Sequence, residues 1–318
     1  MHTYTERVNS NSYTAIIHSY AKVNLTLDVL DLMPNGFHAI ESIMQTIALH
    51  DTIRLSLVEP PGVRVVCDLP DIPTNERNLA YRAAVLFLEN VGLKLGIEIQ
   101  LKKRIPPEAG LGGGSSNAAS VLRGLNHLVA SSELKVSKDG VLSLEAMIDL
   151  AARIGSDVPF FLVGGTAFVR GRGEDVEPLP DIRRWWMVIV KPPFGISTAW
   201  AYKRLDEMRE ECGWRVHKEQ GTASARMLDC IRKNCDELPS LLSNDLEAPA
   251  QERHQEIATI KSALIKEGAK GALMCGSGSA VFGLFEDEDS AQQAVKNLNF
   301  GFGRVFKTHT ISRKEAQV

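Results

Sequence analysis

The stretch EAGLGGGSSNAAS, residues 108–120, constrains the fold more than any other part of this sequence. It places four glycines in five positions, followed by two serines and small residues that favour a helix. The preceding GIEIQLKKRIP (96–106) alternates apolar and polar residues and predicts a strand, whereas apolar residues from Ala118 to Leu128 recur at helical spacing. Strand, glycine loop and helix together predict an anion site, because glycines let backbone N–H groups approach an anion and the helix N-terminus adds positive potential.

Two familiar phosphate-binding motifs do not match this loop. A Walker loop needs Gly-Lys-Ser/Thr, and no lysine occurs between Glu108 and Leu122. A dinucleotide fingerprint needs GxGxxG, but Ser115 stands where its third glycine should be. The loop therefore predicts an anion site of another type, in which Ser115 and Ser116 cap the helix or contact a phosphate. The alternative is a glycine-rich turn that only packs closely.

Composition limits the range of functions. The chain has 318 residues, enough for two domains, and its net charge of −3 gives no basic surface for nucleic acid or an anionic membrane. No apolar run reaches the roughly 20 residues that span a bilayer. Five cysteines without a CxxC pair indicate free thiols in a reducing cytosol. The polar N-terminus resembles neither a secretory signal nor a transit peptide, so we expect a cytoplasmic protein, bacterial rather than plastid, with a disordered lead-in over residues 1–18.

Four ordered stretches carry a family resemblance. PPEAGLGGGSSNAAS (106–120) resembles the phosphate loop of the GHMP small-molecule kinases, whose pattern is Pro-x-x-x-Gly-Leu-Gly/Ala-Ser/Gly-Ser-Ser. SYAKVNLTLDV (19–29), GSDVPFFLVGGTAFVRGRGE (155–174) and ALMCGSGSAVFGLF (272–285) resemble that family's N-terminal strand, catalytic segment and third motif. Within the family, GLGGGSSNAA is most similar to the kinases that act on a cytidine-diphosphate-linked methylerythritol in the non-mevalonate route to isoprenoids.

The resemblance implies an α+β fold in two domains. Its N-terminal domain would be similar to domain 2 of ribosomal protein S5, its C-terminal domain would be ferredoxin-like, and the site would lie in the cleft between them. We place the boundary near Asp181, before the apolar strand WWMVIVKPP. Residues 19–181 then form the nucleotide-binding domain and residues 182–318 the second domain. The polar segment 211–234 is the least readable part.

Phosphoryl transfer to a hydroxyl needs held phosphates, a positioned hydroxyl and a group that accepts its proton. The resemblance implies that Asp157 is this base and that Lys22 lies beside it. Read without the family, Asp157 could equally cap the short SDVPFF turn, and Lys22 would more often be an edge lysine that faces water.

On the substrate side, NGFH matches the family's DGYH, so Phe37 and His38 are expected at the cytidine. Asn24 shares the strand face of Lys22 and could bond the same end of the substrate. Tyr202 is the best match for a second ring that closes on the base, with Trp200 as competitor, and either ring could instead be part of the core. Gly276, Ser277 and Gly278 form a second turn, expected to close on the substrate diphosphate unless it is a plain tight turn.

The resemblance also implies a site for ATP. Its residues would be Asn78, Lys103, Pro107, Gly110, Leu111, Gly112, Gly113, Gly114, Ser115, Ser116 and Asn117. We expect the Glu108 carboxylate to point away from the triphosphate, which would repel it. Magnesium is implied by ATP, held mostly by phosphates and water, with Ser116 as a candidate ligand.

The expected activity is ATP-dependent phosphorylation of the 2-hydroxyl of the methylerythritol compound. The partner is a small molecule, with neither nucleic acid nor membrane, and the oligomeric state stays open. One alternative is a GHMP kinase for homoserine, mevalonate or a sugar, and another is a non-catalytic nucleotide-binding module. RNA binding through the S5-like fold is a third alternative, but the net negative charge disfavours it.

Overall fold

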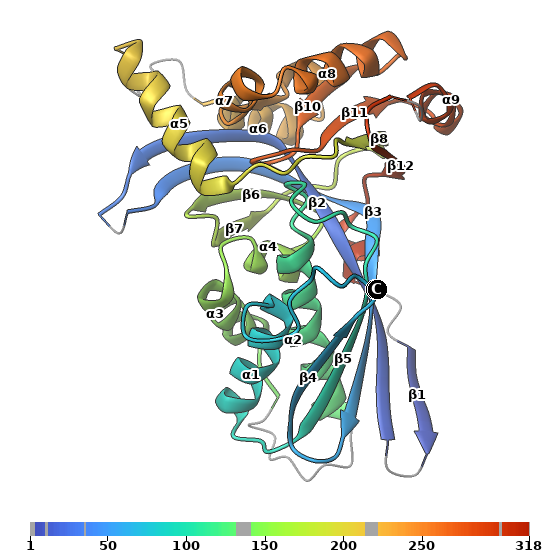
Figure 1. The fold of residues 1–318 in the computed structure, drawn as a ribbon. Helices are drawn as coiled ribbons and strands as arrows, with labels where there is room; N and C mark the ends of the chain where they lie inside the picture. Colours follow the sequence, from blue (N-terminus) through green and yellow to red (C-terminus); the bar gives the residue numbers. More distant parts are fainter. Residues whose placement is uncertain are drawn as a thin grey trace.

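A computed structural model describes residues 4–9, 12–34, 36–131, 141–213, 222–298 and 301–317. It contains two β-sheets with helices packed against them (Figure 1). The elements up to the predicted boundary are β1 (Tyr4–Asn9), β2 (Ser12–Leu32), β3 (His38–Val58), β4 (Gly62–Cys67), α1 (Leu79–Val91), β5 (Gly96–Lys102), α2 (Gly113–Ser131), α3 (Leu144–Ile154), α4 (Val158–Val163), β6 (Thr166–Gly171) and β7 (Asp175–Pro178).

The elements after Asp181 include the four strands of the second sheet and the helices that accompany them. They are β8 (Trp186–Lys191), α5 (Thr198–Glu211), α6 (Ala223–Lys233), the 3₁₀ turn η2 (Leu238–Leu241), β9 (Ser243–Asn244), α7 (Glu247–Arg253), α8 (Glu256–Lys266), β10 (Gly271–Met274), β11 (Val281–Phe285), α9 (Glu288–Leu298), β12 (Arg304–His309) and α10 (Arg313–Gln317). The α+β fold in two domains expected from the sequence is confirmed, and Asp181 lies between β7 of the first sheet and β8 of the second.

The N-terminal sheet is built around the long antiparallel pair β2 and β3. Its order is β1-β2-β3-β5-β4, with β6 also paired to β3, β7 to β6 and β9 to β2. Alternating apolar residues of β2, β3 and β5 face the helices, and Ile17, Ile53 and Ile99 pack with Phe87 of α1 and Leu122 of α2 in one core. This packing fixes the start of α2, where the glycine loop ends, against the middle of β2.

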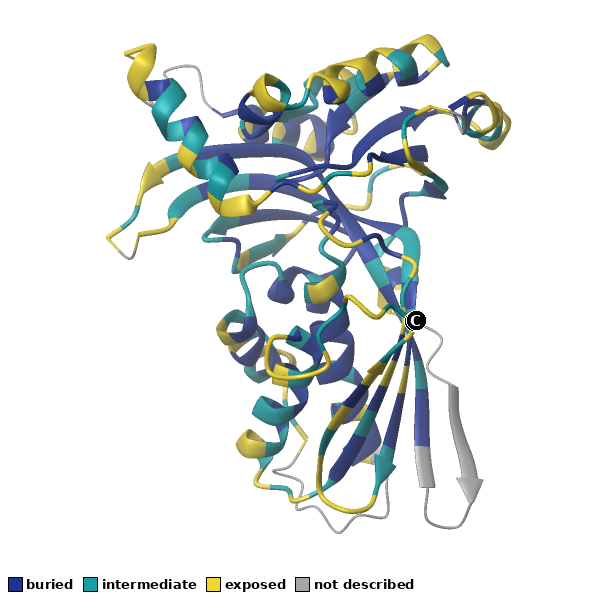
Figure 2. Ribbon diagram, viewed as in Figure 1, coloured by how far each residue is buried: buried dark blue, intermediate teal, exposed yellow. Residues whose placement is uncertain are grey.

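The C-terminal sheet has the order β10-β11-β8-β12, with every pair antiparallel. Strand order and the helices between the strands give the ferredoxin-like arrangement that the resemblance implied. A second core joins the sheets, because Val23 and Leu25 of β2 pack with Ile189 of β8 and Phe282 of β11. Buried residues accordingly continue along β2 and β3 into the C-terminal sheet (Figure 2).

Two features of the first domain differ from the expectation: part of the chain after Asp181 packs on its sheet, and part of the predicted lead-in belongs to β2. The segment after Asp181 returns to the first sheet, since Ala223 and Ser224 of α6 donate backbone hydrogen bonds to Asp28 of β2. The lead-in predicted over residues 1–18 is wrong where it overlaps β2, because Ala15 and Ile17 are fully buried in the sheet. Residues 1–3, 10 and 11 of that lead-in lie outside the described residues, as do residues 214–221 of the 211–234 segment.

One expectation about the cysteines is also wrong. Cys230 and Cys235 form a disulfide, with their Cα atoms 5.0 Å apart, while Cys67, Cys212 and Cys275 are free. Helix α6 ends at Lys233, and the left-handed backbone of its C-cap residue Asn234 turns the chain back over the last helical turn and brings Cys235 beside Cys230. The pairing follows from this turn and not from a CxxC motif.

Local residue types mark the ends of two helices. Asn78 caps α1 by accepting a hydrogen bond from Ala80, Gly92 closes the helix with a left-handed backbone, and Gly155 follows α3. Among the described residues, no helix is long and apolar enough to cross a membrane.

Candidate active site

A large cleft of about 1190 Å³ lies between the two domains. Its walls come from β2, the start of β3, the glycine loop, the start of α4, helix α5 and the turn that follows β10. The residues expected at the site that line it are Lys22, Asn24, Phe37, His38, Asn78, Lys103, Pro107, Gly110, Leu111, Gly112, Gly113, Gly114, Asn117, Asp157, Tyr202, Gly276, Ser277 and Gly278. Segments far apart in sequence therefore meet at one cavity.

The Lys22 ammonium and the Asp157 carboxylate form an ion pair in this cleft. Lys22 Nζ lies 3.3 Å from Asp157 Oδ2 and donates a hydrogen bond of 2.7 Å to Asn24 Oδ1. Asn24 in turn donates to Ser42 Oγ at 2.8 Å, which fixes the amide orientation. The Lys22 side chain is 5% exposed and that of Asp157 is 31% exposed. The lysine is thus no water-facing edge residue, and the carboxylate is the more accessible member of the pair.

Asp157 is held at the start of α4 without capping it. Its backbone occupies the N-cap position, yet its side chain makes no capping hydrogen bond. The helix is stabilised instead by Pro159 in its first turn and by the burial of Phe160 and Leu162. The simple capping interpretation of Asp157 is therefore not supported, and the carboxylate is free to face the cleft.

The glycine loop is hydrogen-bonded to β2. The backbone N–H of Lys22 donates to Leu111 O at 3.1 Å, so the loop runs beside Lys22. Helix α2 forms its first hydrogen bond from Ser116 N to Gly112 O, and the N–H groups of Gly113 and Gly114 donate to no described residue. Free N–H groups at the N-terminus of a long helix suit a phosphate.

A second glycine turn closes on the first. Gly110 has a φ of 73°, and a Cβ there would lie 1.8 Å from Cys275 O, so only glycine fits. The N–H groups of Ser279 and Ala280 donate to the carbonyls of Glu108 and Ala109, both at 3.3 Å. The turn at 276–278 therefore does more than reverse the chain, because it joins the second domain to the glycine loop.

Asn244 fixes the second turn through hydrogen bonds to its backbone. Its Nδ2 donates to Met274 O at 3.0 Å and to Gly276 O at 2.7 Å, while its Oδ1 accepts from Leu246 N. The Glu247 carboxylate accepts the Met274 N–H at 2.8 Å. These contacts fix Gly276, whose Cβ position lies 3.4 Å from Lys22 Nζ.

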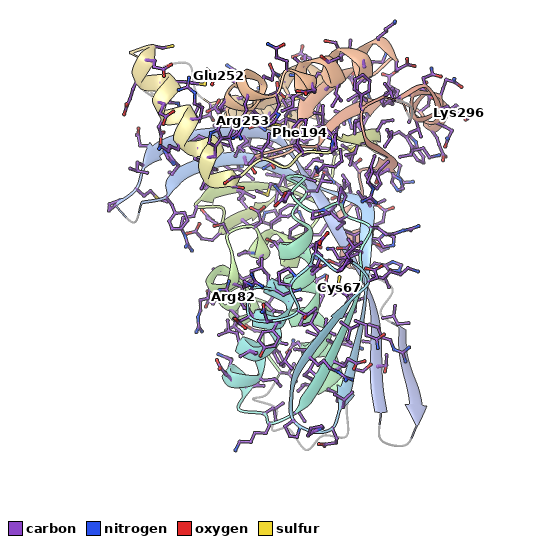
Figure 3. The ribbon with its side chains drawn as sticks, in the orientation of Figure 1. Cys67, Arg82, Phe194, Glu252, Arg253 and Lys296 are labelled. Carbon is purple, nitrogen blue, oxygen red and sulfur yellow. A yellow bond between two sulfur atoms is a disulfide. The ribbon has the colours of Figure 1, made fainter. Side chains whose placement is uncertain are left out.

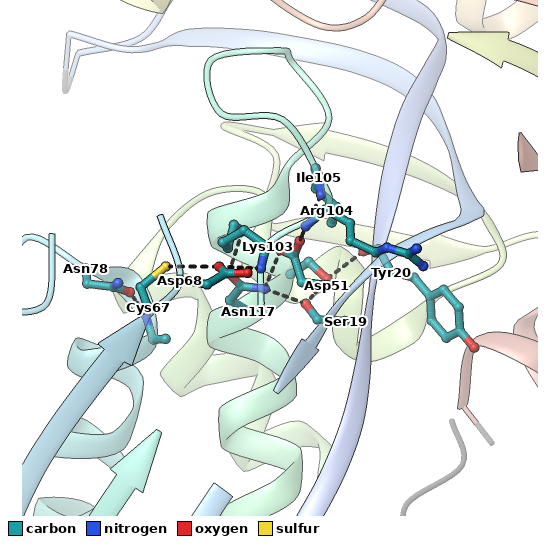
Figure 4. Close-up of polar contacts among 12 residues, drawn as sticks. Ser19, Tyr20, Asp51, Cys67, Asp68, Asn78, Lys103, Arg104, Ile105 and Asn117 are labelled. Carbon is teal, nitrogen blue, oxygen red and sulfur yellow. Dashed lines mark hydrogen bonds and ion pairs between the residues drawn. The ribbon is translucent and has the colours of Figure 1, made fainter. Parts of the chain in front are cut away.

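A buried polar network lies beneath the start of α2 (Figure 4). Asp51 of β3 is fully buried and accepts from Lys103 Nζ, from the backbone N–H groups of Arg104 and Ile105, and from Asn117 Nδ2 at 2.9 Å. Lys103 also donates to Asn117 Oδ1 at 2.9 Å. Lys103 and Asn117 thus line the cleft with their polar groups already bonded to protein, which indicates that they position the loop.

Two further residues predicted to contact the nucleotide, Ser116 and Asn78, form side-chain hydrogen bonds with other parts of the protein. Ser116 is buried, its hydroxyl donates to Tyr20 O at 2.5 Å and bonds Ser19 Oγ at 2.7 Å, and neither it nor Ser115 lines the cleft. With its hydroxyl bonded to protein, Ser116 is less suited to contact a phosphate or magnesium, and that contact stays a prediction. Asn78 lies at the rim, where it caps α1 and donates to Pro73 O.

The two candidate aromatic residues for stacking on the base, Tyr202 and Trp200, differ in whether they line the cleft. Tyr202 lines the cleft and stacks on His38, with ring centroids 5.3 Å apart at 26°. Burial raises the pKa of Tyr202, with Asp157 and Asp245 adding to the effect. Trp200 instead lies under the guanidinium of Arg253, at 4.8 Å (Figure 3 labels Arg253 beside α5), and is not part of the cleft lining in the described chain. The geometry favours Tyr202 over Trp200.

Phe37 and Glu108 lie at the edge of the cleft. Phe37 is 54% exposed, and the Arg172 guanidinium lies 5.8 Å from its ring centroid. Glu108 lies against Gly195 of the second domain, since a Cβ on that glycine would be 2.2 Å from Glu108 Oε2. The side chain is thus directed toward the facing domain.

Several residues that line the cleft or support its walls were not predicted from the sequence. They are Asp51, Asp206, Asn244 and Glu247, each of which contacts a predicted site residue or turn. Their neighbours in the sequence give no signal of a site, since Asp206 stands in the polar stretch YKRLDEMREE and Asp51 precedes the ordinary alternating strand TIRLSLV. Among the described residues, no group of three or more His, Cys, Asp or Glu side chains could hold a metal ion.

The fold and the two facing glycine turns define a small-molecule kinase of the GHMP class. Residues 78–165 match the family model described as the GHMP kinases N terminal domain, and residues 227–303 match the model described as GHMP kinases C terminal. GHMP kinases use ATP. A crystal structure of homoserine kinase from Cytophaga hutchinsonii shares the fold, with a TM-score of 0.71 at 21% identity over 97% of both chains.

Relatives with higher sequence identity place the chain in one family within the GHMP kinases. The chain is 38% identical to the 4-diphosphocytidyl-2-C-methyl-D-erythritol kinase of Alkaliphilus metalliredigens, over 94% of this chain and 97% of the relative. It is 41% identical to the enzyme of that name from Geobacter metallireducens, over 87% and 92%. A crystal structure of 4-(cytidine 5'-diphospho)-2C-methyl-D-erythritol kinase matches with a TM-score of 0.71 and 32% identity, over 93% and 98%. The chain belongs to the family of 4-diphosphocytidyl-2-C-methyl-D-erythritol kinases.

Proposed function

We propose that the protein transfers the γ-phosphate of ATP to the 2-hydroxyl of 4-diphosphocytidyl-2-C-methyl-D-erythritol, giving ADP and the 2-phosphate. The observation that carries the proposal is the Lys22–Asp157 ion pair of 3.3 Å, placed between two glycine turns in one interdomain cleft. The names of the relatives support the choice of substrate.

Each part of the site has a role in this reaction. The N–H groups at the start of α2 would hold the ATP phosphates, and the turn at 276–278 would close on the acceptor from the second domain. Asn24 and Lys22 would bond the acceptor hydroxyl, which places it within reach of Asp157. The Asp157 carboxylate would accept the hydroxyl proton as the new bond to phosphorus forms.

The base of the substrate would bind at the far end of the cleft. His38 would bond the edge of cytosine, while Tyr202 and Phe37 offer ring faces from opposite domains. Phe37 has no hydroxyl, so its contribution is limited to stacking. This end of the cleft would distinguish the cytidyl compound from homoserine or mevalonate, which carry no base.

Magnesium would accompany ATP without a protein cage. The described residues offer no cluster of acidic ligands, and the hydroxyl of Ser116 is bonded to Tyr20 O. Phosphate oxygens and water are ligands that Mg²⁺ accepts readily, so the residues present fit a metal that is bound mainly through the nucleotide. We propose the bacterial cytosol as the compartment, because the relatives come from bacteria.

The test is ADP release by the purified protein with ATP and magnesium. Three acceptors are compared: the cytidyl compound, homoserine and mevalonate. We expect turnover only with the cytidyl compound and a fall in kcat of about 10²–10⁴-fold in Asp157→Asn, the usual range for loss of a general base. Turnover with homoserine or mevalonate would show that the proposed substrate is wrong. Nucleotide binding without turnover of any acceptor would favour a non-catalytic module.

A further inference from the structure

Helix α5 holds the His38 ring on two sides. Tyr202 and Asp206 are one helical turn apart and therefore share a face of the helix. The Tyr202 ring stacks on the imidazole, and Asp206 Oδ1 lies 3.0 Å from His38 Nε2. The His38 side chain is 10% exposed, so its orientation is set by these two neighbours.

The contact with Asp206 decides which nitrogen of His38 carries the proton. A carboxylate only accepts hydrogen bonds, so Nε2 must carry a hydrogen when it bonds Asp206. In the uncharged imidazole the other nitrogen, Nδ1, is then an acceptor. Among the described residues, Nδ1 has no hydrogen-bond partner, and His38 lines the cleft. A ligand that reaches Nδ1 would therefore meet a hydrogen-bond acceptor.

We propose that Asp206 is a positioning residue that fixes the Nε2–H tautomer of His38, and that this makes the cleft select a pyrimidine with a 4-amino group over one with a 4-oxo group. Cytosine offers an N–H donor at that position, whereas uracil offers an oxygen that the lone pair on Nδ1 would repel. The inference rests on the proposed function for the placement of the base, and it adds the residue that sets the choice of base.

The tautomer is tested first, on the protein without ligand. Nitrogen-15 NMR of the histidine side chains, with His38 assigned through His38→Gln, is expected to show the uncharged His38 ring as the Nε2–H tautomer. In Asp206→Asn the amide can accept or donate, so a mixture of tautomers is expected. Asp206→Glu keeps a carboxylate and should keep the Nε2–H form. A single Nδ1–H form in the unaltered protein would overturn the proposal.

Selectivity is tested by binding, which does not depend on turnover. The probes are cytidine 5'-diphosphate and uridine 5'-diphosphate, which have equal charge, titrated with ADP in excess to fill the nucleotide site. The unaltered protein should bind the cytidine probe more tightly, and the ratio of the two Kd values should fall about tenfold in Asp206→Asn. Glu207→Gln removes the same charge from the next position of α5, away from His38, and should leave the ratio unchanged.

The outcomes separate this inference from the proposed function. Equal binding of the two probes by the unaltered protein, or an unchanged ratio in Asp206→Asn and Asp206→Ala with a normal melting temperature, overturns the role of Asp206. A ratio that falls in these variants and is retained in Asp206→Glu supports it. Absence of turnover with the cytidyl compound, alongside selective binding, would overturn the proposed reaction and leave the role of Asp206 standing.

Discussion

Lys22 and Asn24 show how two positions of one strand serve one site. They are two residues apart on β2, so their side chains leave the same face, and Lys22 Nζ reaches both Asn24 Oδ1 and Asp157 Oδ2. The strand fixes the first two residues, and the start of α4 brings the third to them. Geometry at this scale explains why a lysine is buried here at low cost, since its charge is paired and hydrogen-bonded.

Loss of the Lys22 charge should impair catalysis more than folding. In Lys22→Met we expect kcat to fall about 10²–10³-fold, because the acceptor hydroxyl loses a cationic partner next to the base. Steady-state ADP release measures the effect. The control is Lys233→Met, an exposed lysine on α6 that pairs with Asp229 far from the cleft. Equal activities of the two variants would remove Lys22 from the mechanism.

We expect substitutions of Tyr202 and Trp200 to have different effects on the KM for the cytidyl substrate. Tyr202→Ala should raise the KM for the cytidyl substrate about 10–100-fold, since a stacked base loses its platform. Trp200→Ala should leave this KM nearly unchanged, because Trp200 packs against Arg253 instead of lining the cleft. Kinetic assays of both variants over a range of substrate concentrations test this. A large effect confined to Trp200→Ala would reverse the assignment.

At the scale of secondary-structure elements, Asp51 joins three segments. It lies on β3, bonds the chain after β5 through Lys103, Arg104 and Ile105, and reaches α2 through Asn117. The end of the strand before the glycine loop and the helix after the loop are thus tied to one buried carboxylate. This explains how a loop with so few side chains can keep one shape.

Breaking this buried pair on one side should be costly. Asp51→Asn leaves the Lys103 ammonium without its counter-charge, and we expect the free energy of unfolding to fall by about 3–5 kcal/mol. Asp51→Asn with Lys103→Met should recover part of this loss, because no unpaired charge is left.

Denaturant unfolding of the single and double variants measures this coupling. The same cycle at the exposed Asp229–Lys233 pair should give less than about 1 kcal/mol. Additive effects at Asp51 and Lys103 would contradict a coupled pair.

Local signals in the sequence predicted elements better than they predicted contacts. Caps such as Asn78 and Gly92 act within a few residues, so α1 could be placed from its own sequence. The partner of Asp51 is 52 residues away, and nothing local identifies it. The sequence offers Ser116 as a helix cap or a phosphate contact, whereas in the structure its hydroxyl donates to Tyr20 O of β2.

At the scale of the whole molecule, the site exists only where the two domains meet. The family resemblance located both halves, since the glycine loop and the turn at 276–278 are motifs in the sequence. Their mutual contact depends on the shared core around Val23 and Phe282 and on the return of α6 to the first sheet. Such long-range packing has no signature that a single sequence reveals.

Cys275 reports on this domain contact. It is fully buried, burial raises its pKa to about 12, and its carbonyl lies against Gly110. A thiol whose pKa lies far above the solution pH forms little thiolate, so near pH 8 we expect Cys275 to be alkylated at least ~100-fold more slowly than the exposed Cys212. Mass spectrometry of the alkylated peptides over time measures both rates. Similar rates would mean that the domains separate readily.

The most direct test of the proposed reaction is phosphorus-31 NMR of the mixture of protein, ATP, magnesium and the cytidyl substrate. The account predicts one new phosphomonoester signal, formed in equal amount with ADP, while the two phosphorus signals of the cytidyl diphosphate persist. Asp157→Asn should form it at a greatly reduced rate. Inorganic phosphate with ADP and no new monoester would contradict phosphoryl transfer to this substrate.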